Sequence, residues 1–203
     1  MSDKPKVFLS YAREDSEPVR KIFRYLSDQG FRPWMDTERL PGGVAWWKDI
    51  QHAIKQSDFF VICLSPRSVA KLATRKRNFL KQEVEIALKI QNATNLEIEK
   101  QEDRIGEITN ELAELARQSS KPSKASLKTK NKEFQKAIRR LAEKKGEAIF
   151  VIPIRLADCE LPKELKMYQA VDCSDLVAMR NCLKAMLKEK KKRNKLKAKG
   201  IKY

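Results

Sequence analysis

Residues 7–36 read VFLSYAREDSEPVRKIFRYLSDQGFRPWMD, and this stretch decides the fold. Two short apolar runs, residues 7–11 and 31–35, have the length and the Val, Phe and Met content of buried strands. Between them, in residues 14–29, apolar side chains recur every three or four positions, which is typical of an amphipathic helix. Gly30 follows at the place where a glycine commonly ends a helix. The stretch therefore predicts one strand–helix–strand unit.

Polar side chains follow both strands of this unit. Ser10 and Arg13 come at the end of the first strand, and Asp36 comes directly after the second. In open parallel sheets, ligands bind in the crevice outside the carboxyl ends of the strands. We therefore expect these three side chains to lie at a ligand-binding edge.

Three further strands are predicted in residues 59–64, 149–156 and 170–173, and helices are predicted in residues 46–56 and 175–191. The strand runs are apolar nearly throughout, which is typical of strands that are covered on both faces. Strands that alternate with helices favour parallel pairing with right-handed crossovers. The prediction is a flavodoxin-like, doubly wound parallel α/β sheet.

A long helical segment, residues 89–147, separates the third strand from the fourth by much more than an ordinary connection. We predict that it is an insertion, so that residues 1–88 and 148–190 form the sheet domain. Residues 191–203 are predicted to form a basic C-terminal tail.

The insertion has the pattern of an antiparallel helical hairpin. An unbroken helix over residues 78–117 would be roughly 60 Å long, and Pro122 cannot continue it. Two apolar stripes with heptad spacing face each other in this scheme. They are Ile98, Ile105, Ile108, Leu112 and Leu115 before the break, and Leu127, Phe134, Ile138 and Leu141 after it. The long helix should pack against something, and both the returning helix and a second copy of the chain are candidates.

Composition narrows the class of protein. The four cysteines contain no CxxC pair and the chain has one histidine, His52, so we expect buried free thiols and neither a metal site nor a catalytic triad. The sequence shows no secretory leader and no run of eighteen apolar residues. We expect a cytoplasmic protein without a transmembrane segment.

The formal net charge of +17 is concentrated in two places. Residues 184–203 hold ten Lys or Arg and one acid, and residues 119–132 hold five lysines and no acid. Such runs attract polyanions without sequence preference. The aromatic side chains that stack on single-stranded bases are missing from these runs, apart from Tyr203. Weak polyanion binding by the lysine-rich tail is therefore expected, and the alternative is a plain solvated surface.

Several motifs of the chain resemble a Toll/interleukin-1 receptor (TIR) domain of the bacterial type. They are FLSYAREDSEPVRKIFRYLSDQGFRPWMD in residues 8–36, the Pro-Gly-Gly loop in residues 41–43, SDFFVICLSP in residues 57–66 and FLKQEVEIAL in residues 79–88. The likeness covers residues 5–88 and resumes at residues 149–156. It does not include the helical insertion or the lysine-rich tail.

The resemblance implies an NAD+ glycohydrolase that cleaves the nicotinamide N-glycosidic bond and releases nicotinamide with ADP-ribose or a cyclic isomer. NAD+ is then the substrate and no further cofactor is needed. The resemblance also implies activation by self-association with other TIR domains and a role in prokaryotic defence. It places the catalytic carboxylate at Glu83 and substrate-binding roles at Ser10, Arg13, Trp34, Asp36, Gly43 and Phe79.

A single carboxylate is chemically sufficient for this reaction, because the cationic nicotinamide is a good leaving group that needs no general acid. Glu85 cannot form a carboxylate pair with Glu83, because residues two apart on a helix point in different directions. Phe79 lies one turn before Glu83 on the same face, although many family members have Trp at this position.

Two alternatives stay open at this stage. The chain is either the enzyme or a non-catalytic TIR module that recruits partners as a scaffold, since a fold does not fix a function. Each candidate residue also has an ordinary structural explanation: Arg13 and Glu83 as residues of helix starts, Trp34 as core, Asp36 as a turn residue. A phosphoacceptor receiver domain is disfavoured, because Ser65 stands where that class has an aspartate.

Overall fold

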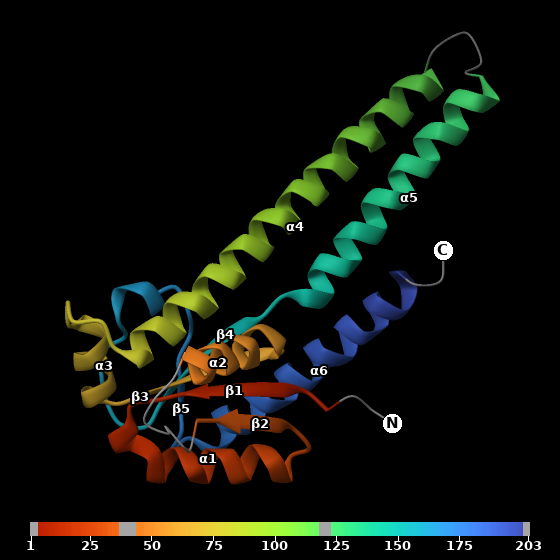
Figure 1. The fold of residues 1–203 in the computed structure, drawn as a ribbon. Coiled ribbons are helices and arrows are strands. Elements are labelled where there is room, and N and C mark those ends of the chain that lie inside the picture. Colours follow the sequence, from red (N-terminus) through yellow and green to blue (C-terminus); the bar gives the residue numbers. More distant parts are fainter. Residues whose placement is uncertain (1–3, 37–43, 118–122, 201–203) are drawn as a thin grey trace. The chain divides into compact units, whose positions relative to one another are not determined.

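The computed structural model describes residues 4–36, 44–117 and 123–200 (Figure 1). The chain divides into two compact units, Met1–Gln91 with Ile149–Lys190, and Asn92–Ala148 with Lys191–Tyr203. We call the first the sheet unit and the second the hairpin unit.

The sheet unit contains five parallel strands in the order β2-β1-β3-β4-β5, which confirms the predicted flavodoxin-like topology. The strands are β1 (Lys6–Ser10), β2 (Arg32–Met35), β3 (Phe59–Leu64), β4 (Phe150–Arg155) and β5 (Val171–Asp172). All six residues of the central strand β3 are buried, which explains why this strand is apolar throughout. The strand order reverses between β1 and β3, so a ligand is expected at their carboxyl ends.

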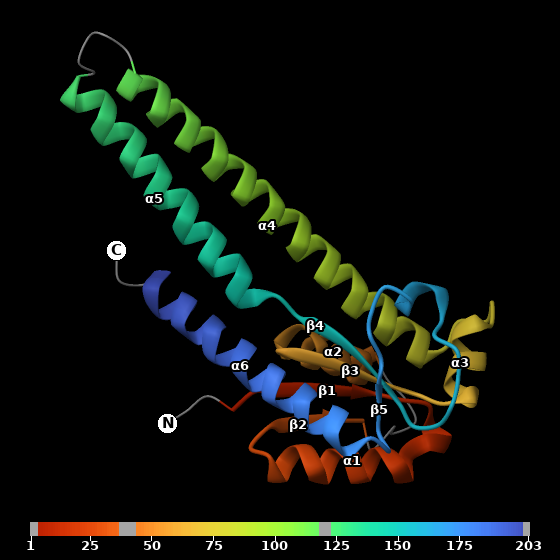
Figure 2. The ribbon, with the colours of Figure 1, turned by 180° about the vertical axis from the view of Figure 1, so that it is seen from behind.

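Helices cover both faces of the sheet. One face packs against α1 (Ser16–Asp28) and the first part of α6 (Leu176–Gly200). Both helices are labelled in Figure 2, which is turned by 180° from Figure 1. The other face packs against α2 (Val44–Gln56), α3 (Pro66–Ala73) and the first turns of α4 (Phe79–Arg117). Two short 3₁₀ helices, η1 (Arg13–Asp15) and η2 (Lys163–Leu165), complete the unit.

The turn between α1 and β2 follows the prediction for Gly30. This residue has a φ of 84°, and its backbone N–H donates to the carbonyl of Ser27. The next N–H, of Phe31, donates to the carbonyl of Leu26 over 3.0 Å. A side chain at position 30 would be strained at this φ, so glycine is the residue that ends the helix here.

In the hairpin unit, the long part of α4 is followed by α5 (Lys124–Glu147). Ile108 and Ala137 are buried between the two helices. The prediction for Ile138 is wrong, because this side chain is 39% exposed and the adjacent Ala137 takes the buried position. A heptad pattern allows either residue at this point, and the smaller one lets the helices approach more closely.

Helix α6 does not end at Lys191 as predicted. It continues to Gly200, so the part of the lysine-rich tail that the structure describes is helical. Lysine is a good helix former and its long side chain stays in water, so the charge run does not stop the helix. No helix within the described ranges combines the length and the apolar composition that a membrane span requires.

Candidate functional site

The predicted catalytic residue is held at the carboxyl end of the first strand. Ser10, the last residue of β1, donates a hydrogen bond from its hydroxyl to Oε2 of Glu83 over 2.7 Å. Ser10 is fully buried and Glu83 is 3% exposed. The two residues are 73 positions apart and come together beside β3, where the strand order reverses. A carboxylate thus lies at the edge of the sheet where this topology commonly places ligands.

Local helix geometry explains why Glu83 faces inward. α4 begins at Phe79, and Leu80, Val84 and Ala87 pack on the sheet. Glu83 precedes Val84 and follows Leu80 by three positions, so it lies on the same buried side of the helix. It reaches the tip of β1, whereas Glu85 borders a separate small cavity.

Aromatic rings lie on the same side of the sheet. Trp34 on β2 stacks on Phe8 of β1 with ring centroids 4.8 Å apart, and Phe8 is on the same face as Ser10, two residues later. Trp34 remains 36% exposed. Phe79 is 39% exposed, and its ring centroid is 5.8 Å from that of Trp47 on α2. Trp34 and Phe79 are both partly exposed, and a flat heterocycle can stack on exposed aromatic rings.

The remaining predicted site residues are Arg13, Asp36 and Gly43. Arg13 is exposed in η1, directly after the first strand. Asp36 is half-buried, and its backbone carbonyl accepts a hydrogen bond from the hydroxyl of Tyr11 over 2.7 Å. Gly43 lies outside the described residues, as does most of the loop between β2 and α2. The structure therefore brings together Ser10 and Glu83, and it places Trp34 on the same face.

A second polar network at this edge was not predicted. The hydroxyl of Ser65 donates to Oδ2 of Asp15 over 2.6 Å, and both side chains are buried. Ser65 also caps α3 by accepting from the backbone N–H of Ser68, while Ser68 accepts from the backbone N–H of Ser65. The sequence Ser-Pro at positions 65–66 is a recognisable helix start. The hydrogen bond from Ser65 to Asp15 could not be predicted in the same way, because only the fold brings these two residues together.

Ser65→Ala should lower the free energy of unfolding by about 2 kcal/mol, because it removes a helix cap and a buried hydrogen bond together. Urea denaturation measures the change. Ser27→Ala is the matched control, since the Ser27 hydroxyl donates to a carbonyl of its own helix at an exposed position. Equal effects of the two substitutions would contradict a structural role for the Asp15–Ser65 link.

Two other kinds of reactive group in the described ranges are cysteine thiols and clusters of metal-ligating side chains. All four cysteines are free, and burial raises the pKa of the Cys63 thiol. A thiol with a raised pKa is a poor nucleophile at neutral pH. No group of three or more His, Cys, Asp or Glu side chains within those ranges is arranged to hold a metal ion.

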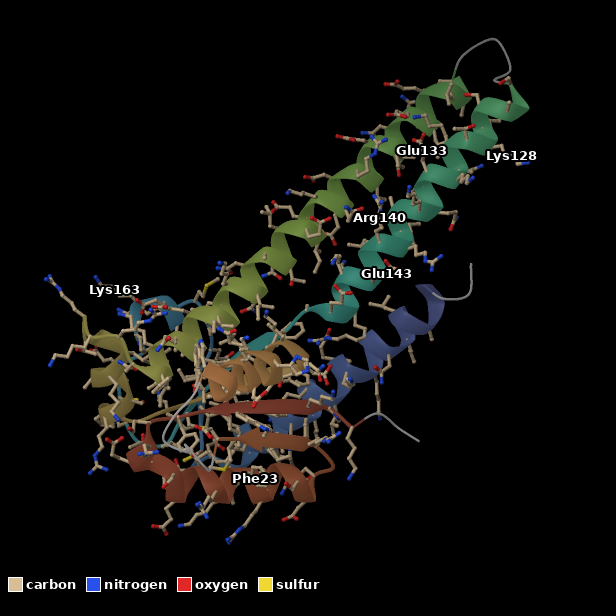
Figure 3. The ribbon with its side chains drawn as sticks, in the orientation of Figure 1. Phe23, Lys128, Glu133, Arg140, Glu143 and Lys163 are labelled. Atoms are coloured by element: carbon tan, nitrogen blue, oxygen red, sulfur yellow. The ribbon has the colours of Figure 1, made fainter. Side chains whose placement is uncertain are left out.

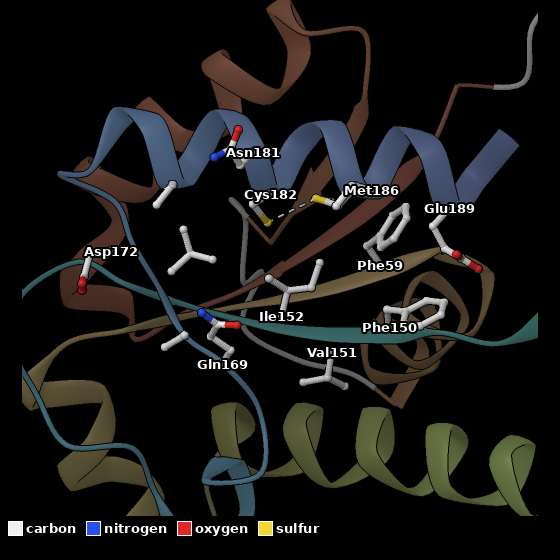
Figure 4. Close-up of a pocket in the computed structure, with 14 residues that line it drawn as sticks. Phe59, Phe150, Val151, Ile152, Gln169, Asp172, Asn181, Cys182, Met186 and Glu189 are labelled. Carbon is white, nitrogen blue, oxygen red and sulfur yellow. Dashed lines mark hydrogen bonds between the residues drawn. The ribbon is translucent and has the colours of Figure 1, made fainter. Parts of the chain in front are cut away.

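A cleft of about 680 Å³ lies on another part of the sheet unit, between β4, β5 and α6 (Figure 4). It forms because β5 pairs only with Ile154 and Arg155, which leaves the first part of β4 without a neighbouring strand on that side. Apolar side chains such as Ile152 and Met186 line it, with Asp172 and Glu189 among the polar ones. It contains none of the predicted site residues.

Comparison with known proteins gives a family match and a fold match. Residues 7–99 match the family model described as TIR domain. The TIR domain of the Toll-related receptor TRR-2 from Hydra magnipapillata is similar at 17% identity, with a TM-score of 0.50, over 89% of this chain and 96% of that one. The TIR domains of the activated Roq1 resistosome, which recognises the pathogen effector XopQ, align at 15% identity and a TM-score of 0.32, over 97% and 84% of the two chains. None of the curated proteins matches the sequence. Residues 7–99 of the chain are thus similar to the TIR domain family, and the likeness to the Hydra domain shows that the two share a fold.

Proposed function

We propose that the chain is an NAD+ glycohydrolase that releases nicotinamide and ADP-ribose, or a cyclic isomer, and that self-association activates it. We place it in the cytoplasm and in prokaryotic defence signalling, where loss of NAD+ or the product itself carries the signal. The single observation that carries the proposal is the hydrogen bond from Ser10 to Glu83 at the point where the strand order reverses.

The chemistry follows from the charge of the substrate. When the N-glycosidic bond breaks, nicotinamide leaves as a neutral molecule with the bonding electron pair, and positive charge develops on the ribose. The carboxylate of Glu83 stabilises that charge and holds the ribose hydroxyls. Water, or a nucleophilic atom of the substrate itself for a cyclic product, then bonds to the anomeric carbon and loses a proton. The leaving group requires no second carboxylate.

The remaining residues receive binding roles. Ser10 orients the carboxylate of Glu83, because its hydroxyl donates to Oε2 of that side chain. Trp34 and Phe79 offer partly exposed rings for the flat parts of NAD+. Arg13, exposed after β1, neutralises the pyrophosphate. Asp36 and Gly43 complete the proposed set at the loop that follows β2.

Nicotinamide release from NAD+ tests the proposal. The purified chain is incubated with NAD+, and nicotinamide and the adenine-containing product are separated by chromatography. Release of nicotinamide in equal amount to the NAD+ consumed supports the proposal. Absence of release at high protein concentration, both with and without a crowding agent, would reject it.

Trp34→Ala should raise KM for NAD+ about tenfold, because a ring stacked on a base contributes roughly 1–3 kcal/mol to binding. The turnover rate should change less than KM. Phe150→Ala is a matched control, since Phe150 is an aromatic residue of a strand with the same 36% exposure. If the two variants have the same KM, Trp34 does not contact the substrate.

The second candidate is a non-catalytic scaffold, and one observation favours it. At 3% exposure, Glu83 is covered in this conformation, so catalysis requires a rearrangement that opens the site. A scaffold needs no such change. The two functions separate cleanly, because partner recruitment by a scaffold does not require a carboxylate at position 83.

A further inference from the structure

Charge is segregated between the two helices of the hairpin unit. Residues 92–117 of α4 hold seven Asp or Glu and three Lys or Arg. Residues 124–147 of α5 hold nine Lys or Arg and three Glu. Charged side chains cover both helices in Figure 3. One helix of the hairpin is therefore acidic and the other is basic.

The contact between the two helices already uses this difference. Glu111 of α4 pairs with Lys130 of α5 over 2.5 Å, and Glu102 of α4 pairs with Lys145 of α5 over the same distance. The carboxylate of Glu111 raises the pKa of Lys130, and Lys130 lowers the pKa of Glu111. Both pairs are at the surface, where an ion pair adds little stability but favours one arrangement of helices over others.

The outer face of α4 carries acidic groups that remain unpaired. Glu99, Asp103 and Glu114 are exposed and have no ion-pair partner in the described part of the chain. At 100° per residue they fall within about 60° of arc. Glu99 is nine residues before the buried Ile108, and nine residues at 100° each leave the two side chains half a turn apart. The acidic face is therefore opposite to the contact with α5.

The outer face of α5 is its basic counterpart. Lys128, Lys132 and Lys136 follow each other at intervals of one helical turn, are exposed, and likewise lack an ion-pair partner among the described residues. They fall within about 80° of arc. Lys128 is nine residues before the buried Ala137, so these lysines point away from α4.

The acidic face also has a shape that another helix can approach. Gly106 lies between Asp103 and Glu114 on this face, and a Cβ atom added to it would meet nothing within 4 Å. Leu96, at the start of the face, is 53% exposed. The open space at Gly106 lets another helix approach this part of the face.

We propose that the outer face of α4 in one copy of the chain packs antiparallel against the outer face of α5 in the next copy. The partner is a second copy because the same hairpin carries both complementary faces. The internal contact of acidic α4 with basic α5 is then repeated between molecules. Each copy offers one acidic and one basic face, so the contact is heterologous and joins the hairpins head to tail.

This inference rests on the proposed self-association and names a surface for it, but it does not require NAD+ cleavage. Charge reversal tests it in the full chain. One variant carries Lys128→Glu, Lys132→Glu and Lys136→Glu, so that both outer faces are acidic. The other carries Glu99→Lys, Asp103→Lys and Glu114→Lys, so that both are basic. Sedimentation velocity at about 50 mM and about 500 mM salt measures association without NAD+.

Wild-type chains should associate at low salt, and each reversal should weaken that association by about tenfold or more, since three attractive contacts become repulsive. A mixture of the two variants in equal amounts should associate again. Reversal of Lys184, Lys188 and Lys192 on α6, which changes the net charge by the same amount as the α5 reversal, should have a smaller effect. Circular dichroism confirms that the variants keep their helices.

Three results of the sedimentation experiment would overturn the proposed contact between α4 and α5 of neighbouring copies. They are a wild type that stays monomeric at low salt, reversals that leave association unchanged, and a mixture of the two variants that does not associate. The proposal is also overturned if the α5 reversal only lowers binding to duplex DNA, because the lysine row then serves a polyanion. Failure of this proposal is distinguishable from failure of the proposed NAD+ cleavage, because association is measured without NAD+ and nicotinamide release is measured separately.

Discussion

Glu83→Gln should reduce nicotinamide release by about a thousandfold while leaving the chain folded. Glutamine keeps the size and the hydrogen-bonding capacity of the side chain, so the contact with Ser10 over 2.7 Å can persist. It removes the negative charge that offsets the developing positive charge on the ribose. The expected loss is therefore in the turnover rate, with a much smaller change in KM.

Glu85→Gln is the matched control, because Glu85 lies two residues along the same helix and borders a different cavity. Its activity should stay within about twofold of the wild type, as for a surface substitution away from the site. Loss of activity in Glu85→Gln and retention in Glu83→Gln would reassign the catalytic residue. Unchanged activity in both variants would contradict a mechanism in which either carboxylate is catalytic.

Lys190→Ala should lower the free energy of unfolding by about 3 kcal/mol, the largest effect on stability that we predict. Nζ of Lys190 is 2.9 Å from both carboxylate oxygens of Asp58, and the two side chains are only 8% and 11% exposed. Asp58 also accepts a hydrogen bond from the backbone N–H of Lys6. Removal of the ammonium group deprives a largely buried carboxylate of its ion pair with Lys190.

Urea denaturation of two further variants makes this test specific. Lys188→Ala removes an exposed lysine from the same helix and should change stability by less than about 0.5 kcal/mol. The double variant Asp58→Ala, Lys190→Ala should lose less than the sum of the two single variants, because neither partner is left alone. Additive losses would show that the ion pair does not act as a unit.

The strands were predictable from the sequence because the sheet is covered on both faces. β3 is buried along its whole length, so its run of apolar residues has one simple explanation. The helices of the sheet unit were predictable from their apolar spacing. The hairpin was predictable as a hairpin, but its contact surface at Ala137 was not, because the heptad pattern also allows the more hydrophobic Ile138.

Contacts between residues that are far apart in the sequence could not be predicted from such patterns. Asp58 and Lys190 are 132 residues apart, and Asp15 and Ser65 are 50 apart. Each of these residues has an ordinary role when it is considered alone, as a turn, cap or surface residue. Only the fold brings them together. The position of Glu83 beside Ser10 differs from these cases, because the resemblance to the TIR family drew attention to both residues.

The central claim is that Glu83, held by Ser10 at the carboxyl end of β1, acts on NAD+ when copies of the chain assemble. The most direct measurement is the rate of nicotinamide release by the wild-type chain over a roughly hundredfold range of protein concentration. A rate that rises more steeply than the protein concentration is the predicted result. Folded protein that releases no nicotinamide anywhere in this range would contradict the claim.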